Sequence, residues 1–373
     1  MIASRFLPRQ HLQTLFDQLD ALGYRCIGPQ VRDGAIVYDR LGDLTALPIG
    51  IGAHQTPGRY RLEHQDHQRC FAWANGPQAL KPLLFAPHET LWRTERDDAG
   101  RLAFTRELQP AQRQAVIGVR ACDLAALALQ DAHFADARAD PSYSRRRHDL
   151  LLVGVECGQP ADTCFCASTG EGPAISTGTD LTLTELDAGF LVRAGTEVGS
   201  ALCDALPLRA PSDGELAQAE AEIEQARLSQ HRSLPGRNLR ESLFANLDHP
   251  RWDEVATRCL ACGNCVAVCP TCFCSTEREQ PSIDGSGSTR VRLWDSCFSA
   301  EHSYVHGRLL RPDTRTRYRQ WLTHKLGGWH DQYGRSGCVG CGRCIAWCPV
   351  GIDLTAEANA ICSDASESAQ EAP

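Results

Sequence analysis

The sequence predicts two regions of different fold class: a mixed α/β region over residues 1–212 and a helical region over residues 251–362. Before residue 212, short apolar runs alternate with helical patterns. From Asp213 the composition becomes charged and Ala-rich, and two dense cysteine runs follow residue 251. We therefore expect a helical linker over residues 213–250. We expect a disordered tail over residues 363–373, which is polar apart from alanine and proline.

The spacing of apolar residues predicts the first elements of the α/β region. Leucine and phenylalanine recur at helical intervals over residues 8–23, and Gly23 can end that helix. Residues 24–29 and 35–38 read as short strands around an Arg-Asp-Gly turn. Glycine and proline then divide residues 56–92 into short pieces without a clear period.

A strand–helix–strand unit is the clearest pattern of this region. Ala115–Val119 and Leu150–Val155 are short apolar runs typical of buried strands, and Asp123–Phe134 between them has helical spacing. Such a unit normally forms neighbouring parallel strands with a right-handed crossover. Residues 181–186 and 190–194 flank Asp-Ala-Gly and predict a hairpin.

The C-terminal half is predicted to be mainly helical. Apolar residues recur at helical spacing after Asp213, and a second helix is expected over residues 238–247. A Gly/Ser-rich turn at residues 284–288 precedes a basic stretch, roughly residues 302–326, that we expect to form a long helix. No Gly-x-Gly-x-x-Gly and no phosphate-binding loop occurs, so nothing in the sequence indicates a nucleotide site.

Composition limits the compartment and the partners. The 373 residues include 19 cysteines, but no apolar leader or membrane-spanning run is present. Thiols in a long chain of this kind indicate a reducing compartment and metal or redox chemistry, so we expect a cytoplasmic protein. The formal charge of −8 argues against a nucleic-acid partner.

Two cysteine runs dominate the C-terminal region. Each reads Cys-x2-Cys-x2-Cys-x3-Cys-Pro, the spacing of bacterial-type [4Fe–4S] sites in which the fourth cysteine ligates the other cluster. The first cluster is therefore assigned to Cys259, Cys262, Cys265 and Cys348, and the second to Cys338, Cys341, Cys344 and Cys269. Zinc knuckles are the alternative, but zinc sites usually use two separated cysteine pairs. Two cluster runs separated by a long helix are typical of an α-helical ferredoxin domain.

Four further cysteines are expected to meet at one edge of the predicted sheet. Cys122 and Cys157 directly follow the two buried strands, and ligands of parallel sheets bind at the carboxyl ends of strands. Cys164 and Cys166 lie in the next loop. These four residues predict a third Fe–S cluster, and the alternative is a set of ordinary buried thiols.

The other cysteines divide into two groups. Cys272 and Cys274 follow the first run directly, and Cys297 lies in Asp-Ser-Cys-Phe. They are packing partners beside a cluster, an extra metal site or a redox-active thiol pair. The isolated thiols are interpreted as structural; these are Cys26, Cys70, Cys203 and Cys362.

The stretch before the second run is strongly basic. Its cations are Arg308, Arg311, Arg315, Arg317, Arg319 and Lys325. A run of charge is usually a solvated helix face. The functional alternatives are compensation of cluster charge and docking of an acidic partner subunit. The sequence leaves all three interpretations open.

Several segments together resemble one family. They are TPGRYRLE, NGPQALKPLLFAPHETLW, GVRACD, CFCASTGEGP, CGNCVAVCPTCFC, RLWDSCF and GCVGCGRCIAWCPVGID, between about residues 50 and 355. They resemble the beta subunits of sulfhydrogenases, which are soluble NAD(P)-linked [NiFe] hydrogenases, and equally the corresponding iron–sulfur subunit of anaerobic sulfite reductase. One departure is Ala121, where the family pattern has proline, and it removes no candidate ligand.

The resemblance implies an electron-transfer protein that is not a catalyst by itself. Its expected partners are a diaphorase-type flavoprotein carrying FAD and reacting with NAD(P), and either the small and large subunits of a [NiFe] hydrogenase or a sirohaem-containing sulfite reductase protein. A third hypothesis is a thiol/disulfide enzyme, as in heterodisulfide reductases, acting at Cys272 and Cys274. A fourth, an oxygen-sensing regulator, lacks any nucleic-acid-binding element in the sequence.

Overall fold

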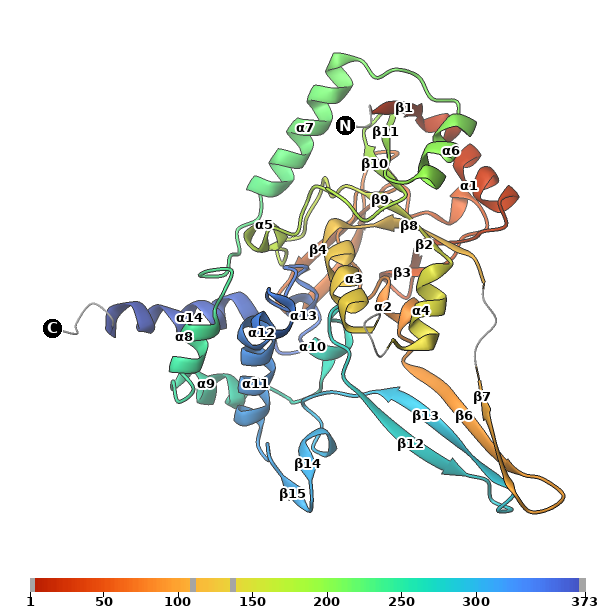
Figure 1. Cartoon of the computed structure of the whole chain (residues 1–373). Helices are drawn as coiled ribbons and strands as arrows, with labels where there is room; N and C mark the ends of the chain where they lie inside the picture. The colour runs from red at the N-terminus through yellow and green to blue at the C-terminus, as the bar shows by residue number, and fades with distance from the viewer. Residues whose placement is uncertain (1–3, 108–111, 135–138, 369–373) are drawn as a thin grey trace.

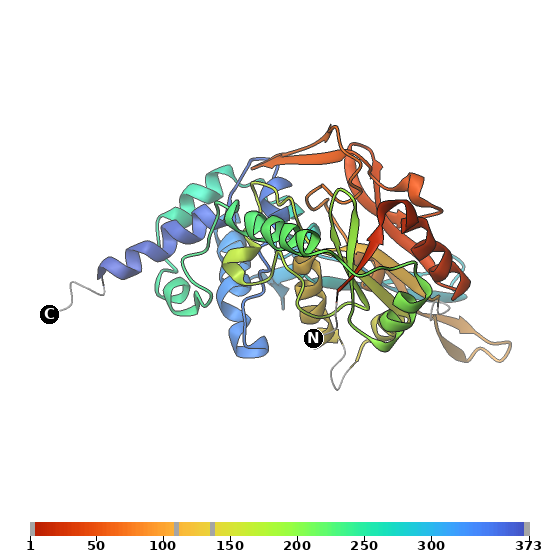
Figure 2. The same ribbon diagram turned by 90° about the horizontal axis from the view of Figure 1, so that it is seen from above.

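The computed structural model describes residues 4–107, 112–134 and 139–368 of the chain. It is a mixed α/β structure in which a large sheet occupies the N-terminal part and helices dominate the C-terminal part (Figure 1). Helix α14 (Leu354–Ser368) projects away from the rest of the chain in both views (Figures 1 and 2). It extends past residue 363, where the sequence predicts the start of a disordered tail, and residues 369–373 lie outside the described part.

A seven-stranded sheet forms the framework of the N-terminal part. Its strands lie in the order β1 (Arg5–Pro8), β11 (Gly189–Ala194), β10 (Leu181–Glu185), β9 (Leu150–Val155), β8 (Gln114–Val119), β2 (Arg25–Arg32) and β3 (Ala35–Arg40). The four central strands β10, β9, β8 and β2 are parallel, and the outer pairings are antiparallel. The predicted strand–helix–strand unit and the predicted hairpin are both present in this sheet.

Helices cover both faces of the large sheet, which explains its continuous apolar strands. Ala115 and Ile117 of β8 face a core formed with α1 (Leu12–Ala21) and α6 (Glu197–Ala205), whereas Val116 faces a core formed with α3 (Ala121–Phe134) and α4 (Pro141–His148). This alternation is the two-residue period of a strand. Helix α1 begins at Leu12 because a short edge strand, β1, and a 3-10 turn (Arg9–His11) take up residues expected to be helical.

The sequence does not predict the second sheet. This sheet has the order β12 (Ser275–Pro281), β13 (Gly287–Trp294), β6 (His88–Arg96) and β7 (Leu102–Arg106), and it joins the hairpin between the two cysteine runs to an N-terminal hairpin. The turn expected at residues 284–288 connects β12 to β13. Strand β12 is almost wholly exposed and carries charged residues on both faces, so it lacks the apolar alternation that indicates a strand.

The prediction of one long helix over residues 302–326 is wrong. Residues 301–309 form a 3-10 turn (Glu301–Ser303) and a small ladder of β14 (Tyr304–Val305) and β15 (Arg308–Leu309). Helix α11 (Thr314–Thr323) begins only after Pro312, where the Asp313 carboxylate accepts a 2.8 Å hydrogen bond from the Thr316 amide. A π-helical segment, His324–Gly328, follows it.

The segment expected to be a linker contains the 16-residue helix α7 (Asp213–Leu228), which begins with a capping box between Ser212 and Glu215, and the short helix α8 (Arg240–Ala245). The others are a 3-10 turn (Leu44–Ala46), β4 (Ile51–Thr56), β5 (Arg59–His64), α2 (Lys81–Leu84), α5 (Cys166–Thr169), α9 (Arg251–Arg258), α10 (Asn264–Ala267), α12 (His330–Tyr333) and α13 (Arg343–Ala346). Within the described ranges, no helix combines the length and the apolar character that crossing a bilayer requires.

The two parts of the chain touch directly at the second cysteine run. The Phe165 amide donates a 2.8 Å hydrogen bond to the Gly340 carbonyl. A β-carbon at Gly340 would lie 2.6 Å from the Cα of Cys166, so only glycine permits this approach. The loop that carries Cys164 and Cys166 is therefore held against the loop that carries Cys341.

Candidate metal centres

The two cysteine runs fold alike. Each winds through two residues with positive φ at equivalent positions, Ala261 (50°) and Gly263 (79°) in the first and Gly340 (66°) and Gly342 (73°) in the second. Each then enters a short helix, α10 or α13, that carries the third cysteine. Such left-handed turns reverse the chain tightly, which is what allows three thiols in seven residues to face one volume.

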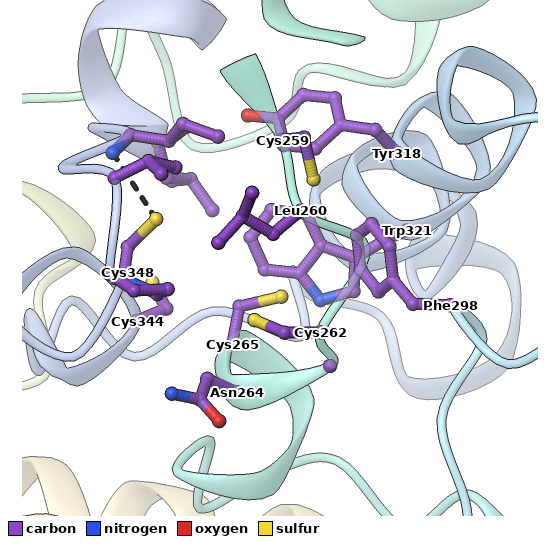
Figure 3. A pocket seen from close by; sticks show the side chains of 15 residues that line it. Cys259, Leu260, Cys262, Asn264, Cys265, Phe298, Tyr318, Trp321, Cys344 and Cys348 are labelled. Atoms are coloured by element: carbon purple, nitrogen blue, oxygen red, sulfur yellow. Dashed lines mark hydrogen bonds between the residues drawn. The ribbon is translucent and has the colours of Figure 1, made fainter. Parts of the chain in front are cut away.

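The first candidate centre combines both runs. Cys259, Cys262 and Cys265 of the first run line one pocket together with Cys348 of the second run (Figure 3). Cys344 also borders this pocket. The Cys348 sulfur accepts a 3.3 Å hydrogen bond from the Ile352 amide.

The pocket is otherwise apolar, lined by Phe298, Tyr318, Trp321, Ile352 and Leu354 among others. Four thiols around an apolar volume match the soft sulfur donors and dry surroundings that an Fe–S cluster uses. The residues present therefore fit the predicted group.

The first centre lies near the molecular surface. Cys262 is exposed, and the side chains of Leu260 and Val350 beside it are 64% and 37% exposed. Cys259, Cys265 and Cys348 are half-buried. A group held here would reach the surface along the edge next to Cys262.

The second candidate centre is more deeply placed. Cys338, Cys341 and Cys269 are buried and Cys344 is half-buried. Burial raises the pKa of Cys344 well above its usual range, and the charges of Cys338, Cys341, Cys269 and Cys265 raise it further. Burial of three of these thiols is consistent with ligation, because uncoordinated thiolates would be costly there.

Two buried lysines accompany this centre. The Lys325 ammonium lies 3.3 Å from the Cys269 sulfur and donates a 2.9 Å hydrogen bond to Thr271. Burial alone would lower the pKa of Lys325, but its interactions with the neighbouring Cys269 and Cys272 raise it well above its usual value. Lys81 donates to three main-chain carbonyls of residues 266, 267 and 269. The chain therefore places buried positive charge where an anionic cluster would bind.

The four N-terminal cysteines lie on segments that follow the carboxyl ends of β8 and β9. Cys122, Cys164 and Cys166 are buried and Cys157 is half-buried. Burial raises the pKa of Cys166 to about 12, and the charge of Cys157 is the second largest cause of this increase. Burial likewise raises the pKa of Cys164, with the charges of Cys166 and Cys157 adding to the shift. The Cys164 thiol lies 3.9 Å from the Cys341 carbonyl, and the charge of Cys341 raises the pKa of Cys122, Cys164 and Cys166, so these three cysteines adjoin the second centre.

A buried ion pair lies beside the two inner sites. The Arg343 guanidinium contacts both oxygens of the Asp123 carboxylate, at 2.7 and 3.1 Å, and its Nε donates a 2.9 Å hydrogen bond to the Gly76 carbonyl. Both side chains are 2% exposed. Asp123 follows Cys122 and Arg343 precedes Cys344, so this pair ties the N-terminal quartet to the second run.

We predict that Asp123→Ala lowers the free energy of unfolding by about 3–5 kcal/mol, because Arg343 would be left buried without its partner. Urea transitions of the anaerobic protein, followed by circular dichroism, measure the change. Asp39→Ala is the control, since Asp39 and Arg32 form an exposed pair whose loss is expected to cost less than about 1 kcal/mol. Equal costs for the two variants would show that the buried pair has no special role.

The three remaining cysteines near the first run form no single group. Cys272 lies beside Cys269, and Cys274 lies beside Cys297 and His302. Among the residues described, no three His, Cys, Asp or Glu side chains converge closely enough to hold one metal ion. The isolated thiols are all buried in hydrophobic cores, as the structural interpretation expected; they are Cys26, Cys70, Cys203 and Cys362.

The cations of the basic stretch make different kinds of contact. Lys325 is the member that contacts a candidate ligand, whereas Arg315 and Arg319 pair with acidic residues of the segment 248–253. Arg317 donates to main-chain carbonyls of residues 298, 311 and 312. The sequence analysis did not identify Lys81 or Arg343 as neighbours of the candidate centres. The position of Arg343 inside the second cysteine run could have indicated its role. Lys81 is distant in sequence from both runs, so no sequence pattern pointed to it.

Comparison with known proteins identifies a domain and a family for this chain. Residues 258–352 match the family model described as a 4Fe-4S dicluster domain. The chain is 30% identical over 276 residues to sulfhydrogenase 2 subunit beta of Pyrococcus furiosus, an alignment that covers 73% of this chain and 79% of that protein. No solved structure matches the chain. The chain belongs to the family of sulfhydrogenase beta subunits and carries their 4Fe-4S dicluster domain.

Proposed function

We propose that this chain conducts single electrons within a soluble hydrogenase complex, between a flavoprotein subunit that carries FAD and reacts with NAD(P) and a [NiFe] hydrogenase module. The observation that carries the proposal is that Cys348 of the second run lines the same pocket as Cys259, Cys262 and Cys265 of the first. When bound, [4Fe–4S] clusters supply reversible one-electron chemistry at potentials set by burial, charge and hydrogen bonds to sulfur.

Crossed ligation would set the spacing of the two centres. Cys348 would hold the first cluster with the three thiols of the first run, and Cys269 would hold the second with Cys338, Cys341 and Cys344. Only three residues separate Cys265 from Cys269, and three separate Cys344 from Cys348. One short segment therefore spans from one centre to the other in each run, and the two centres must lie close together, as rapid electron transfer requires.

The N-terminal quartet supports a third [4Fe–4S] site, held by Cys122, Cys157, Cys164 and Cys166. Its support is the adjacency of these thiols to one another and to Cys341. The sites would then be arranged in a line from the quartet, through the second centre, to the first. The exposed edge around Cys262, Leu260 and Val350 would be one contact with a partner subunit, because the first centre reaches the surface there.

The domain boundaries also belong to this proposal. We infer an α/β domain over residues 1–212 that holds the third site, a helical linker over 213–250, and an α-helical ferredoxin-type domain over 251–362. The core formed by α8, α9, α11 and α14 around the first centre supports the helical assignment. The β12–β13 hairpin is then an insertion between the two cysteine runs.

Lys325 is expected to raise the potential of the second centre. Lys325→Met would remove a buried positive charge 3.3 Å from the Cys269 sulfur, so adding an electron would become harder. A charge interaction of a few kcal/mol corresponds to a negative shift on the order of 100 mV. A redox titration monitored by EPR measures the shift, and Lys325→Arg should restore most of it. An unchanged potential in Lys325→Met would contradict the role of this charge.

Electron flow through the assembled complex tests the function. Purified anaerobic complex is supplied with H2, and both the bleaching of Fe–S absorbance in this chain and the reduction of NAD(P)+ are followed. We expect Cys348→Ser to block nucleotide reduction while hydrogen oxidation with an artificial dye continues. Cys203→Ser, which changes a thiol in the distant sheet core, should retain both activities. Nucleotide reduction at the normal rate in Cys348→Ser would contradict the proposal, and electron delivery to sulfite alone would contradict the hydrogenase assignment.

A further inference from the structure

The base of the β12–β13 hairpin brings together a group of side chains that electron conduction does not use. Ser275 pairs with Trp294 at the end of the ladder, and the Asp295 amide donates a 2.9 Å hydrogen bond to the Cys274 carbonyl. Cys274 is thereby held opposite the segment that contains Asp295 and Cys297. Main-chain pairing fixes these two segments side by side, which makes the proximity of their side chains a property of the fold.

A histidine is oriented toward Cys274 by a carboxylate. The His302 Nδ1 atom lies 2.8 Å from the Asp295 Oδ2 atom, and His302 and Cys274 shift each other's pKa, as neighbouring groups do. Asp295 is itself held by the Ser296 amide and the Ser299 hydroxyl, at 2.7 and 2.8 Å. This order of thiol, imidazole and carboxylate is one that activates a cysteine as a nucleophile.

The two thiols next to each other are placed in different protonation states. The pKa of Cys274 is lowered to about 4, mainly by its interaction with Cys297 and to a smaller extent by its interaction with His302. Interaction with Cys274 and then with Asp295 raises the pKa of His302 to about 9, and the Cys274 charge raises the pKa of Cys297. These directions favour the thiolate at Cys274, the imidazolium at His302 and the protonated thiol at Cys297. Lys325, Lys81, His324 and Cys272 are further groups whose charge couples to Cys274, and Cys265 of the first cysteine run couples to Cys297.

We propose that Cys274 and Cys297 form a redox-active dithiol that exchanges with small disulfides, with His302 and Asp295 positioning the attacking sulfur. The Cys274 thiolate attacks one sulfur of the disulfide and forms a mixed disulfide, and one thiolate leaves. Cys297 then attacks the Cys274 sulfur, closes the Cys274–Cys297 disulfide and releases the second thiolate. The two protons of Cys297 and His302 neutralise the two thiolates, so two electrons and two protons pass to the substrate.

Access to solvent is compatible with this chemistry. Cys274 and Cys297 are both half-buried, and the side chains of His302 and Asp295 are 25% and 15% exposed. Such a partly exposed site beside positive charge is where reactive thiolates are found. The buried thiols of Cys26 and Cys203, whose pKa values burial raises, have no such surroundings.

The test treats the anaerobic, cluster-loaded protein with 2-hydroxyethyl disulfide and maps its peptides. We expect a Cys274–Cys297 cross-link with release of two equivalents of 2-mercaptoethanol, reversed by excess dithiothreitol. Cys297→Ser should instead trap a mixed disulfide on Cys274. His302→Gln should slow alkylation of Cys274 at neutral pH about tenfold and move its pH midpoint upward, a shift that a purely structural histidine would not cause. Cys203→Ser is the matched control and should leave the cross-link unchanged.

Iron content separates this inference from the proposed electron transfer. Cys297→Ser should retain all its iron, since neither thiol of the pair is assigned to a cluster. Loss of about four irons in this variant would overturn the inference, because the pair would then be ligands of a further cluster. Absence of the cross-link in protein with its full iron content would overturn it as well, while leaving the proposed electron transfer intact.

Discussion

Cys348→Ser is expected to abolish the cluster held by the first cysteine run, although Cys348 belongs to the second run and lies far from the first in sequence. The reason is geometric, since Cys348 lines the pocket of Cys259, Cys262 and Cys265. We expect a loss of about four irons per chain, because each cubane holds four. Iron and acid-labile sulfide analysis of the anaerobic protein measures the loss.

Cys269→Ser is the reciprocal variant. It should remove the other cluster, that of Cys338, Cys341 and Cys344, and so should change a different EPR signal from the one that Cys348→Ser changes. If each variant instead lost the cluster of its own run, ligation would be uncrossed and the inferred close spacing of the two centres would be wrong. Cys362→Ser, a buried thiol in the same domain that is assigned to no cluster, should retain both signals.

Cys164→Ser is expected to remove about four irons as well, from the third site, and to leave both EPR signals of the dicluster domain in place. Cys164 is buried among Cys166, Cys157 and Cys341, so its sulfur lies close to other candidate ligands. Cys70→Ser is a matched control in the same α/β region, because Cys70 is also buried but belongs to the sheet core. Full iron content in Cys164→Ser would show that the N-terminal thiols hold no cluster and are structural.

Much of the candidate site could be predicted because cysteine spacing is a local property. The two runs, their prolines and the strands before Cys122 and Cys157 are all visible within short windows of sequence. Parallel strands end at one edge, so the strand order predicted that Cys122 and Cys157 follow the same edge of the sheet. What could not be predicted was that this edge would pack against Cys341, because the contact depends on Gly340 and on how two distant regions dock.

The structure differs from the sequence-based expectations where tertiary contacts outweigh local pattern. Strand β12 is polar and exposed, and it is a strand because it pairs with β13, which in turn pairs with β6 of the N-terminal region. Residues 302–326 have helix-forming composition, but Gly307 adopts a φ of +84° and Pro312 follows, so the helix begins only at Thr314. The fold of this segment also brings His302 to Cys274, a proximity that no spacing rule indicates.

The most direct test of the account is a count of iron and acid-labile sulfide per chain in anaerobically prepared protein, combined with EPR of the reduced state. The account predicts about twelve irons and twelve sulfides, from two [4Fe–4S] clusters in the dicluster domain and a third at the N-terminal quartet, with EPR signals from clusters that interact magnetically. About eight would retain the conducting pair and remove the third site. Iron near zero with stoichiometric zinc would contradict the account as a whole.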